Sequence, residues 1–491
     1  MTRTKLFYRF LFCAVLLCWA PLISQGQTPV AADKVIAIDP KITWGKWDGW
    51  GCSLCWWAKV FGDRDDLADL LYTTRTVTLE GQSLPGLGLN IVRYNAGACS
   101  WNEVGGSKMV VSRTILPFRQ IESFWLDDKS EDPQSASWNW SADANQRAMM
   151  IKARDRGADR FELFSNSPMW WMLSNHNPSG SGKADNLPPE NYRKHAVYLS
   201  AIAQYSRDHW GIAFTTVEPF NESTSNWWIA DGKQEGCHFT PQAQEAVIGM
   251  LRQELDSRGL QAMPIAASDD NNYDGASKNW DAFDSATKAL VEQINVHGYQ
   301  EGKGHRDHVY QAAVRDRKRL WNSEYGEADP VGLRLARNLS LDFHQLHPTA
   351  WCYWQAIDGG KGGGWGLLPG DLTAKTIGVA NPKYFVLAHY SRHIRPGMTI
   401  IDVSDPNAVA AYDAKEHKLI LVVLNEGPAR SVTFDLSKFK EARGPVSRWI
   451  TEPQSKSRYE VHDDNVIDGK SLKCNLPARS VQTFEISHVE S

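Results

Sequence analysis

The chain has little of what would tie it to a nucleic acid or to a disulfide scaffold. Its 491 residues include 53 lysines and arginines against 57 aspartates and glutamates, so it has no basic surplus and we expect no nucleic-acid partner. Only eight cysteines occur. Two of them fall within the first 18 residues, and the other six are too widely spread to form a disulfide scaffold. No repeat of fixed period stands out.

The cysteines also offer no metal centre. Cys52 and Cys55 have the spacing of metal ligands, but no second cysteine pair or histidine pair completes a set of four. We interpret both as thiols of an apolar strand, and we expect neither a metal ion nor a cofactor.

A long membrane-spanning run is missing, although the N-terminus is apolar. Basic residues precede an uncharged apolar run over residues 10–23, and small residues stand at Ser24 and Gly26. This is the pattern of a secretory signal peptide over residues 1–26, and the run is too short for a membrane span. We expect a secreted protein, extracellular or periplasmic, with no membrane span, and we expect a monomer.

Tryptophan, in contrast, is abundant. The chain has 21 Trp, 17 Phe and 15 Tyr, although Trp is usually the rarest aromatic residue. This many tryptophan side chains must either pack in the protein interior or stack on a ligand with a flat face. A sugar ring has such a face. Hydrophobic residues make up 42% and charged residues 22%, as in an ordinary globular protein.

Short strand-like segments alternate with helical ones from about residue 49 to 397. A (β/α)₈ TIM barrel has eight such strands, each followed by a helix. The alternative, an open doubly wound sheet, would need a Gly-rich phosphate turn after an early strand, and none is present. The eight expected strands are WGCSL (50–54), NIVRYN (90–95), RFELFS (160–165), AFTTVE (213–218), PIAAS (264–268), INVHGY (294–299), RLWNSEY (319–325) and TAWCYW (349–354).

The domain organisation follows from a change in pattern near residue 397. Residues 27–396 are expected to form the barrel, and 397–491 an antiparallel β-sandwich of alternating strands. The strand-like segment 33–40 is expected to join that side domain. The longest insertion, 99–143, should lie over the carboxyl-terminal face of the barrel, where active sites of this fold occur.

Two carboxyl groups end strands on opposite sides of the barrel mouth. Glu222 closes the fourth strand and Glu324 the seventh. Two carboxyl groups that flank a glycosidic bond can supply the proton and the nucleophile for its cleavage. Asn221 precedes Glu222 and could hold a sugar hydroxyl. Nearby Glu218 and Glu327 are less suited, since Glu218 precedes a proline within its strand and Glu327 lies beyond the end of its strand.

Other polar and aromatic side chains are expected near this pair. His297 either shapes the sugar subsite or is a core histidine. The polar run 269–272 is interpreted as acceptors for sugar hydroxyls, with Ca²⁺ as the alternative. Two adjacent tryptophans in a strand point to opposite faces of the sheet, so we expect one member of each adjacent Trp pair to lie in the core. We expect Trp171 and Trp354 to contact sugar.

Several segments resemble glycoside hydrolase family 30, and within it most closely the endo-β-1,6-galactanases. The similarity spans essentially the whole mature chain. The segments that carry it are GWGCSLCWWA (49–58), NIVRYN (90–95), SNSPMWWM (165–172), EPFNE (218–222), WNSEY (321–325) and LPARSV (476–481).

The resemblance implies a retaining mechanism with Glu222 as acid/base and Glu324 as nucleophile. Arg93 and Tyr299 match residues that donate hydrogen bonds to the nucleophile. The implied activity is hydrolysis of β-1,6-galactan side chains of arabinogalactan, a polysaccharide substrate. Alternatives are another family 30 substrate (β-1,6-glucan, glucosylceramide, β-xyloside, β-fucoside or glucuronoxylan) or a non-catalytic glycan-binding protein.

Overall fold

The computed structural model describes residues 34–359 and 364–491. The predicted signal peptide lies outside this part of the chain. No helix among the described residues is long and apolar enough to cross a membrane.

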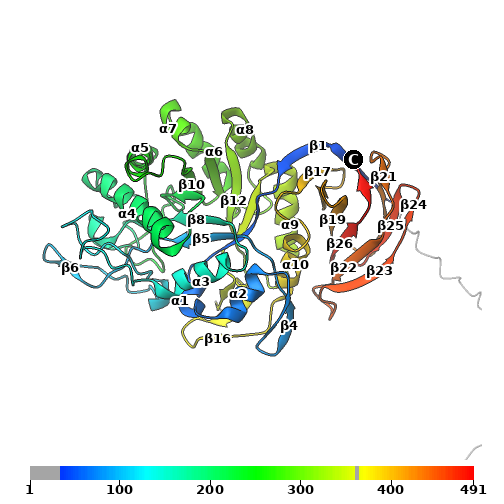
Figure 1. Cartoon of the computed structure of the whole chain (residues 1–491), viewed down its shortest axis with the longest axis horizontal. Coiled ribbons are helices and arrows are strands. Elements are labelled where there is room, and N and C mark those ends of the chain that lie inside the picture. The colour runs from blue at the N-terminus through cyan, green and yellow to red at the C-terminus, as the bar shows by residue number, and fades with distance from the viewer. Residues whose placement is uncertain (1–33, 360–363) are drawn as a thin grey trace, which may run out of the picture.

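The larger unit is a (β/α)₈ barrel, as predicted (Figure 1). Its eight strands are parallel, and a backbone bridge between Val217 and Ile265 links the first and last strands of the sheet order. Every predicted barrel strand is present. The strands, in chain order, are β2 (Gly49–Ser53), β5 (Ile91–Asn95), β8 (Arg160–Phe164), β9 (Thr216–Glu218), β10 (Ala266–Asp270), β11 (Gln293–His297), β12 (Arg319–Tyr325) and β13 (Ala350–Tyr353).

Helices surround the barrel and bury their apolar faces against it. The start of α5 shows how sequence sets a boundary: the Thr240 side chain accepts a hydrogen bond from the Ala243 N–H, and proline occupies the first helical position. The helices are α1 (Trp57–Phe61), α2 (Asp65–Tyr72), α3 (Ala144–Arg154), α4 (Tyr192–Tyr205), α5 (Pro241–Ser257), α6 (Tyr273–Ala282), α7 (Ser285–Leu290), α8 (Arg306–Asp316), α9 (Leu333–Leu341) and α10 (Pro382–Ser391).

The second unit is the β-sandwich side domain, which lies against the α9 and α10 side of the barrel (Figure 1). Its first strand comes from the other end of the chain, because β1 (Lys34–Lys46) pairs with β17 and with β20. Apolar side chains of both layers, among them Ile36, Val432 and Phe484, form a core of their own. The other strands are β17 (Thr399–Val403), β18 (Ala408–Asp413), β19 (Lys418–Asn425), β20 (Arg430–Asp435), β22 (Val446–Thr451), β23 (Glu460–Asn465), β24 (Ile467–Asp468), β25 (Ser471–Leu476) and β26 (Ser480–Ile486).

The insertion after β5 is held together by aromatic stacking. Trp138 stacks on Trp125 and on Trp140, and Trp140 stacks on Tyr205 of α4. Many of the tryptophans therefore pack inside the protein and are not available to bind a ligand. The insertion carries the hairpin β6 (Glu103–Val104) and β7 (Ser107–Lys108), and the remaining short strands are β3 (Thr76–Leu79), β4 (Gln82–Pro85), β14 (Ile357–Asp358), β15 (Leu368–Asp371), β16 (Thr376–Ile377), β21 (Glu441–Ala442) and β27 (Val489–Glu490).

The six cysteines of the described residues are free thiols, and all are buried. Cys52 lies in β2, as predicted, whereas Cys55 lies just after the strand; both thiols are fully buried.

Candidate active site

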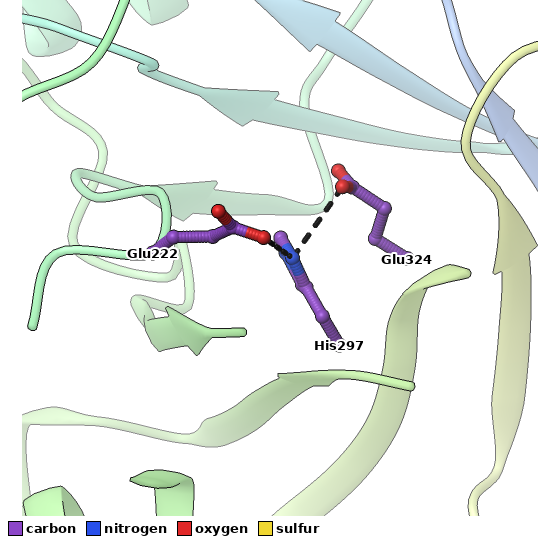
Figure 2. A group of neighbouring side chains, drawn as sticks. All are labelled: Glu222, His297 and Glu324. Carbon is purple, nitrogen blue, oxygen red and sulfur yellow. Dashed lines mark hydrogen bonds and ion pairs between the residues drawn. The ribbon is translucent and has the colours of Figure 1, made fainter. Parts of the chain in front are cut away.

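Three titratable side chains meet at the carboxyl ends of β9, β11 and β12 (Figure 2). The His297 imidazole lies between two carboxyl groups: its Nδ1 is 3.1 Å from Glu222 Oε1 and 3.4 Å from Glu324 Oε1. One oxygen of each glutamate and this nitrogen all lie within 4.8 Å of one another. The two predicted carboxylates therefore face each other across a gap of a few ångströms.

The environment of His297 favours its charged form. The side chain is fully buried, and its Nε2 lies 3.3 Å from Asp269 Oδ1. Burial alone would lower the pKa of this imidazole, but the charges of Glu324 and Asp269 outweigh burial and raise the pKa to about 10. A protonated His297 can donate to a carboxylate on each side, so it belongs to the site and is not an isolated core histidine.

Glu324 is held by two further donors. Arg93 Nη1 and the Tyr299 hydroxyl each donate to its carboxylate over 2.9 Å. Burial raises the pKa of Glu324 above its usual value, while the charges of His297 and Arg93 act in the opposite direction. The structure thus places Arg93 and Tyr299 on Glu324, where the sequence expected them.

Arg93 is the centre of a buried ionic cluster beneath the two glutamates. Its guanidinium donates to Glu162 over 2.9 Å and to Asp269, as well as to Glu324. Ser323 also donates to Asp269. The charge of Arg93 keeps the pKa of Asp269 below its usual range despite complete burial. A buried arginine with three carboxylate partners is fixed in position, and it fixes them in turn.

This cluster corrects the reading of residues 269–272 as acceptors for sugar. Asp269 is fully buried on Arg93, and Asp270 is buried on Thr224 and Asn279. Asn272 caps α6. Only Asn271 of this run lines the cleft. No feature of the sequence signals the inward orientation of the two aspartates, because acidic runs at the end of a strand are usually solvated.

Glu222 is held differently from Glu324. Asn271 Nδ2 donates to one oxygen over 2.7 Å, and Trp227 Nε1 donates to the other over 3.2 Å. The Glu222 backbone has φ +48°, a left-handed conformation that is uncommon for a residue with a side chain. Its N–H donates to the Asp269 carbonyl over 2.8 Å. No arginine or lysine of the described residues is recorded in a salt bridge with Glu222, so the two glutamates differ in their electrostatic surroundings.

A cavity of about 630 Å³ opens over the pair. Asn221, Tyr299 and Trp354 line it together with both glutamates, as predicted from the strand ends. Trp227, Trp228 and Trp365 complete an aromatic wall. Trp227 is 46% exposed, so its indole is available to a ligand.

Trp171 does not lie there, and its prediction as a sugar contact is wrong. It is buried against the edge of Trp125, and its Nε1 donates to the Trp125 carbonyl over 3.1 Å. The physical reason is local: residues 170–172 form a 3₁₀ turn and not a strand, so the alternation of faces does not apply and both Trp170 and Trp171 point inward.

The two rival glutamates lie outside the cleft. Glu218 is fully buried below it, and burial raises its pKa well above the usual value. Glu327 is buried in an ion pair with Lys383 at 2.9 Å. Neither lines the cavity.

Glu222, His297 and Glu324 are also close enough to hold a metal ion. Their donor atoms already have protein partners, because Arg93 and Tyr299 bind Glu324, and Asn271 and Trp227 bind Glu222. A cation would have to compete with the Arg93 guanidinium. The expectation of a metal-free site stays a prediction.

A parallel eight-stranded barrel with two carboxyl groups facing each other at its carboxyl-terminal end is the arrangement of a barrel glycoside hydrolase. The chain belongs to glycoside hydrolase family 30: the family model described as O-Glycosyl hydrolase family 30 matches residues 33–297. The chain is 53% identical to an endo-β-1,6-galactanase of Hypocrea rufa, over 93% of this chain and 95% of that protein.

The chain is also similar to two more distant proteins, one by sequence and one by structure. An exo-β-1,6-galactobiohydrolase of Bifidobacterium longum is 22% identical, over 87% of this chain and 37% of that longer protein. The catalytic domain of a family 30 xylanase C from Talaromyces cellulolyticus superposes with a TM-score of 0.69, covering 92% of this chain and all of that one at 19% identity. At that identity the second likeness shows the shared fold.

Proposed function

We propose that the protein is a secreted, retaining endo-β-1,6-galactanase that hydrolyses β-1,6-linked galactan. The observation that carries the substrate is the 53% identity to an endo-β-1,6-galactanase along nearly the whole of both chains. The geometry that supports the chemistry is the close approach of Glu222 and Glu324 beneath an open, tryptophan-lined cavity. Secretion rests on the signal-peptide pattern of residues 1–26.

In the first step Glu324 acts as nucleophile. One of its carboxylate oxygens forms a bond to the anomeric carbon of the galactosyl unit as the bond from that carbon to the leaving oxygen breaks. Glu222 gives its proton to that oxygen, so the leaving chain departs as an alcohol. Arg93 supports this assignment, because it forms a salt bridge with Glu324 over 2.9 Å and its charge stabilises the ionised form of that carboxyl group.

In the second step water cleaves the glycosyl-enzyme. The Glu222 carboxylate takes a proton from a water molecule, the water oxygen bonds to the anomeric carbon, and Glu324 leaves as a carboxylate. Retaining glycosidases hold their carboxyl groups about 5–5.5 Å apart, whereas inverting ones leave about 6.5–9.5 Å for a water. Oxygens within 4.8 Å of each other support the retaining route.

Residues around the pair would hold the sugar. Asn221 lines the cavity with a buried side-chain oxygen that has no hydrogen-bond partner among the described residues, so it is available to a sugar hydroxyl. Trp354 and Trp365 present ring faces or edges to the cavity, and pyranose rings can pack their apolar C–H faces on indole. Tyr299 touches the nucleophile and lines the same wall.

The decisive experiment is a product analysis with four glycans. Purified mature protein is incubated with β-1,6-galactan, β-1,6-glucan, β-1,4-xylan and β-1,4-galactan, and early products are sized by mass spectrometry. A ladder of oligosaccharides from β-1,6-galactan alone is expected. Release of a single small product from chain ends would show exo action, and cleavage of another glycan would overturn the substrate.

Two variants test the assigned roles. Glu324→Gln should abolish turnover while the protein stays folded and still binds oligosaccharide. Glu222→Ala should lose far more activity on galactan than on an activated aryl galactoside, and azide should restore the latter through a β-galactosyl azide. Equal losses of Glu222→Ala on both substrates, or near-normal activity of Glu324→Gln, would contradict the assignment.

A further inference from the structure

A second cavity lies on the same end of the barrel, outside the catalytic cleft. Its volume is about 400 Å³, within the range of about 300–1,000 Å³ that small-molecule sites occupy. Helix α1, which follows β2, and the loops after β5 and β13 build it. The lining residues that matter here are Lys59, Trp101, Phe118, Gln120 and Lys375.

Trp101 gives this cavity an aromatic platform. Its side chain is 59% exposed, unlike most tryptophans of the chain, and Lys59 Nζ lies 6.0 Å from the centre of its ring. Lys59 also donates to the Gln120 carbonyl, which fixes the amine beside the indole. Among the described residues no carboxylate lines the cavity, although the Lys59 amine lies 3.8 Å from Glu122 Oε1 behind it. An exposed indole with amine and amide donors around it suits a sugar ring, whose C–H face can lie on the indole while its hydroxyls bind the donors.

A short chain of side-chain contacts links the second cavity to the wall of the cleft. Trp354, which lines the cleft, packs against the edge of Trp56 with ring centres 5.2 Å apart. The Arg119 guanidinium lies 4.2 Å from the centre of the same Trp56 ring, and its chain neighbours Phe118 and Gln120 line the second cavity. Trp56 and Arg119 therefore stand between the two cavities.

Arg119 also ties this partition to the loop that carries Glu222. Its Nη1 donates to the Lys233 carbonyl over 3.3 Å, and Lys233 lines the cleft. Close by, Arg113 forms an ion pair with Asp231, which lines the cleft as well. The segment that contains Arg113 and Arg119 is thus held to the loop after β9 by both arginines. The two cavities lie on either side of this segment, at the same end of the barrel.

We propose that the second cavity is a distal binding site for the same β-1,6-galactan chain that is cleaved at Glu222 and Glu324. Trp101 is its stacking platform, and Lys59 and Lys375 are its hydrogen-bond donors. The inference rests on the proposed function, since the occupant is a more remote part of that substrate. An endo-acting enzyme holds a chain that continues beyond the cleft, and this cavity gives the continuation a place to bind.

The test compares Trp101→Ala with wild type over substrates of increasing length. On the shortest β-1,6-galacto-oligosaccharide that wild type cleaves, kcat/KM should be unchanged. On polymeric galactan it should fall roughly five- to tenfold, the loss expected for one aromatic stacking contact. Leu116→Ala is the matched control, because Leu116 is an exposed apolar residue of the same segment that does not line the cavity.

Direct binding provides a second readout. In the Glu324→Gln background, adding Trp101→Ala should reduce retardation of the protein in affinity electrophoresis through gels that contain β-1,6-galactan. Unchanged kinetics and retardation, or an equal loss at every chain length, would overturn the distal site. If wild type itself does not cleave β-1,6-galactan, the proposed function fails, and this outcome is recognised before any variant is compared.

Discussion

Asp269 positions two positively charged side chains of the candidate site, Arg93 and His297, although it is too deeply buried to touch a substrate. Its carboxylate binds Arg93 on one side and approaches the His297 imidazole on the other. Both of those side chains contact Glu324. A change at Asp269 therefore reaches the nucleophile through two partners.

Asp269→Asn should lower kcat by about 10²-fold and leave KM nearly unchanged, because small displacements of catalytic groups have effects of that size. It should also lower the pKa of His297 from about 10, since one of the carboxylates that raise it is lost. Steady-state kinetics and an NMR titration of the imidazole measure the two effects.

Asp270→Asn is the control for this prediction. Asp270 is the next residue and equally buried, but it bonds to Thr224 and Asn279 and not to Arg93 or His297. It should lower the pKa of His297 less than Asp269→Asn does, because Asp270 makes no hydrogen bond or ion pair with the imidazole, and it should cost far less kcat. Equal kinetic losses in both variants would mean that any change in this strand end disturbs the site.

The meeting of Glu222 and Glu324 at the barrel mouth was predictable from the sequence, whereas the ionic cluster beneath them was not. Glu222 and Glu324 stand at strand ends, and a barrel gathers strand ends at one mouth. Asp269 lies at the end of β10, and its side chain points inward because it pairs with Arg93 of β5, a long-range partner. Trp171 was wrongly predicted for a similar reason, since a short turn replaced the assumed strand.

Glu235 joins two loops at the carboxyl-terminal end of the barrel. One of its oxygens accepts hydrogen bonds from the backbone N–H groups of Ala98 and Ile121 and from the Cys99 thiol, each over 3.2 Å, and the other accepts from Asn95. Burial raises the pKa of Glu235 to about 7. The loop after β9 is thereby fastened to the insertion after β5.

Glu235→Ala should reduce the free energy of unfolding by about 3 kcal/mol or more, because four buried donors lose their acceptor. It should also raise KM for galactan, since Trp227 and Trp228 belong to the released loop. Urea denaturation and steady-state kinetics measure these effects. Glu103→Ala, an exposed acid of the insertion, should change neither, and a Glu235→Ala protein as stable as wild type would refute the fastening role.

Among the secondary-structure elements, those with a regular pattern of apolar residues were predicted well from the sequence. All eight barrel strands were found, and α5 begins at Pro241 because Thr240 caps it. A helix end is harder to predict where the helix geometry changes: α4 is α-helical to Tyr205, and the chain continues as a wider turn to Trp210. This change of geometry depends on packing of the helix end against the insertion after β5. The spacing of apolar residues in the sequence carries no information about that contact.

The barrel and the β-sandwich meet at a buried histidine. His389 of α10 is hydrogen-bonded to the hydroxyls of Thr451 and Thr483, each at 2.9 Å, and both threonines belong to the side domain. Burial and the charge of nearby His393 lower the pKa of His389 well below its usual value. The folded protein therefore holds this imidazole neutral, whereas the unfolded chain takes up a proton below about pH 6.5.

Because the unfolded state binds the extra proton, His389 makes the protein less stable as pH falls below about 6.5. The free energy of unfolding should lose up to about 1.4 kcal/mol per pH unit through this one group. His389→Gln should show a shallower fall between pH 6.5 and 5, measured by chemical denaturation. The exposed His308→Gln should keep the wild-type slope, and an unchanged slope in His389→Gln would contradict the assignment.

The pairing of β1 also sets an order of events during synthesis. The barrel strands, β2 to β13, are complete once Tyr353 has been made, but β1 waits for β17 and β20, which end at Val403 and Asp435. For several hundred residues of translation the first strand has no partner, and such distant pairings form late and slowly. The ribosome therefore completes the eight barrel strands before it has made either partner of the first strand.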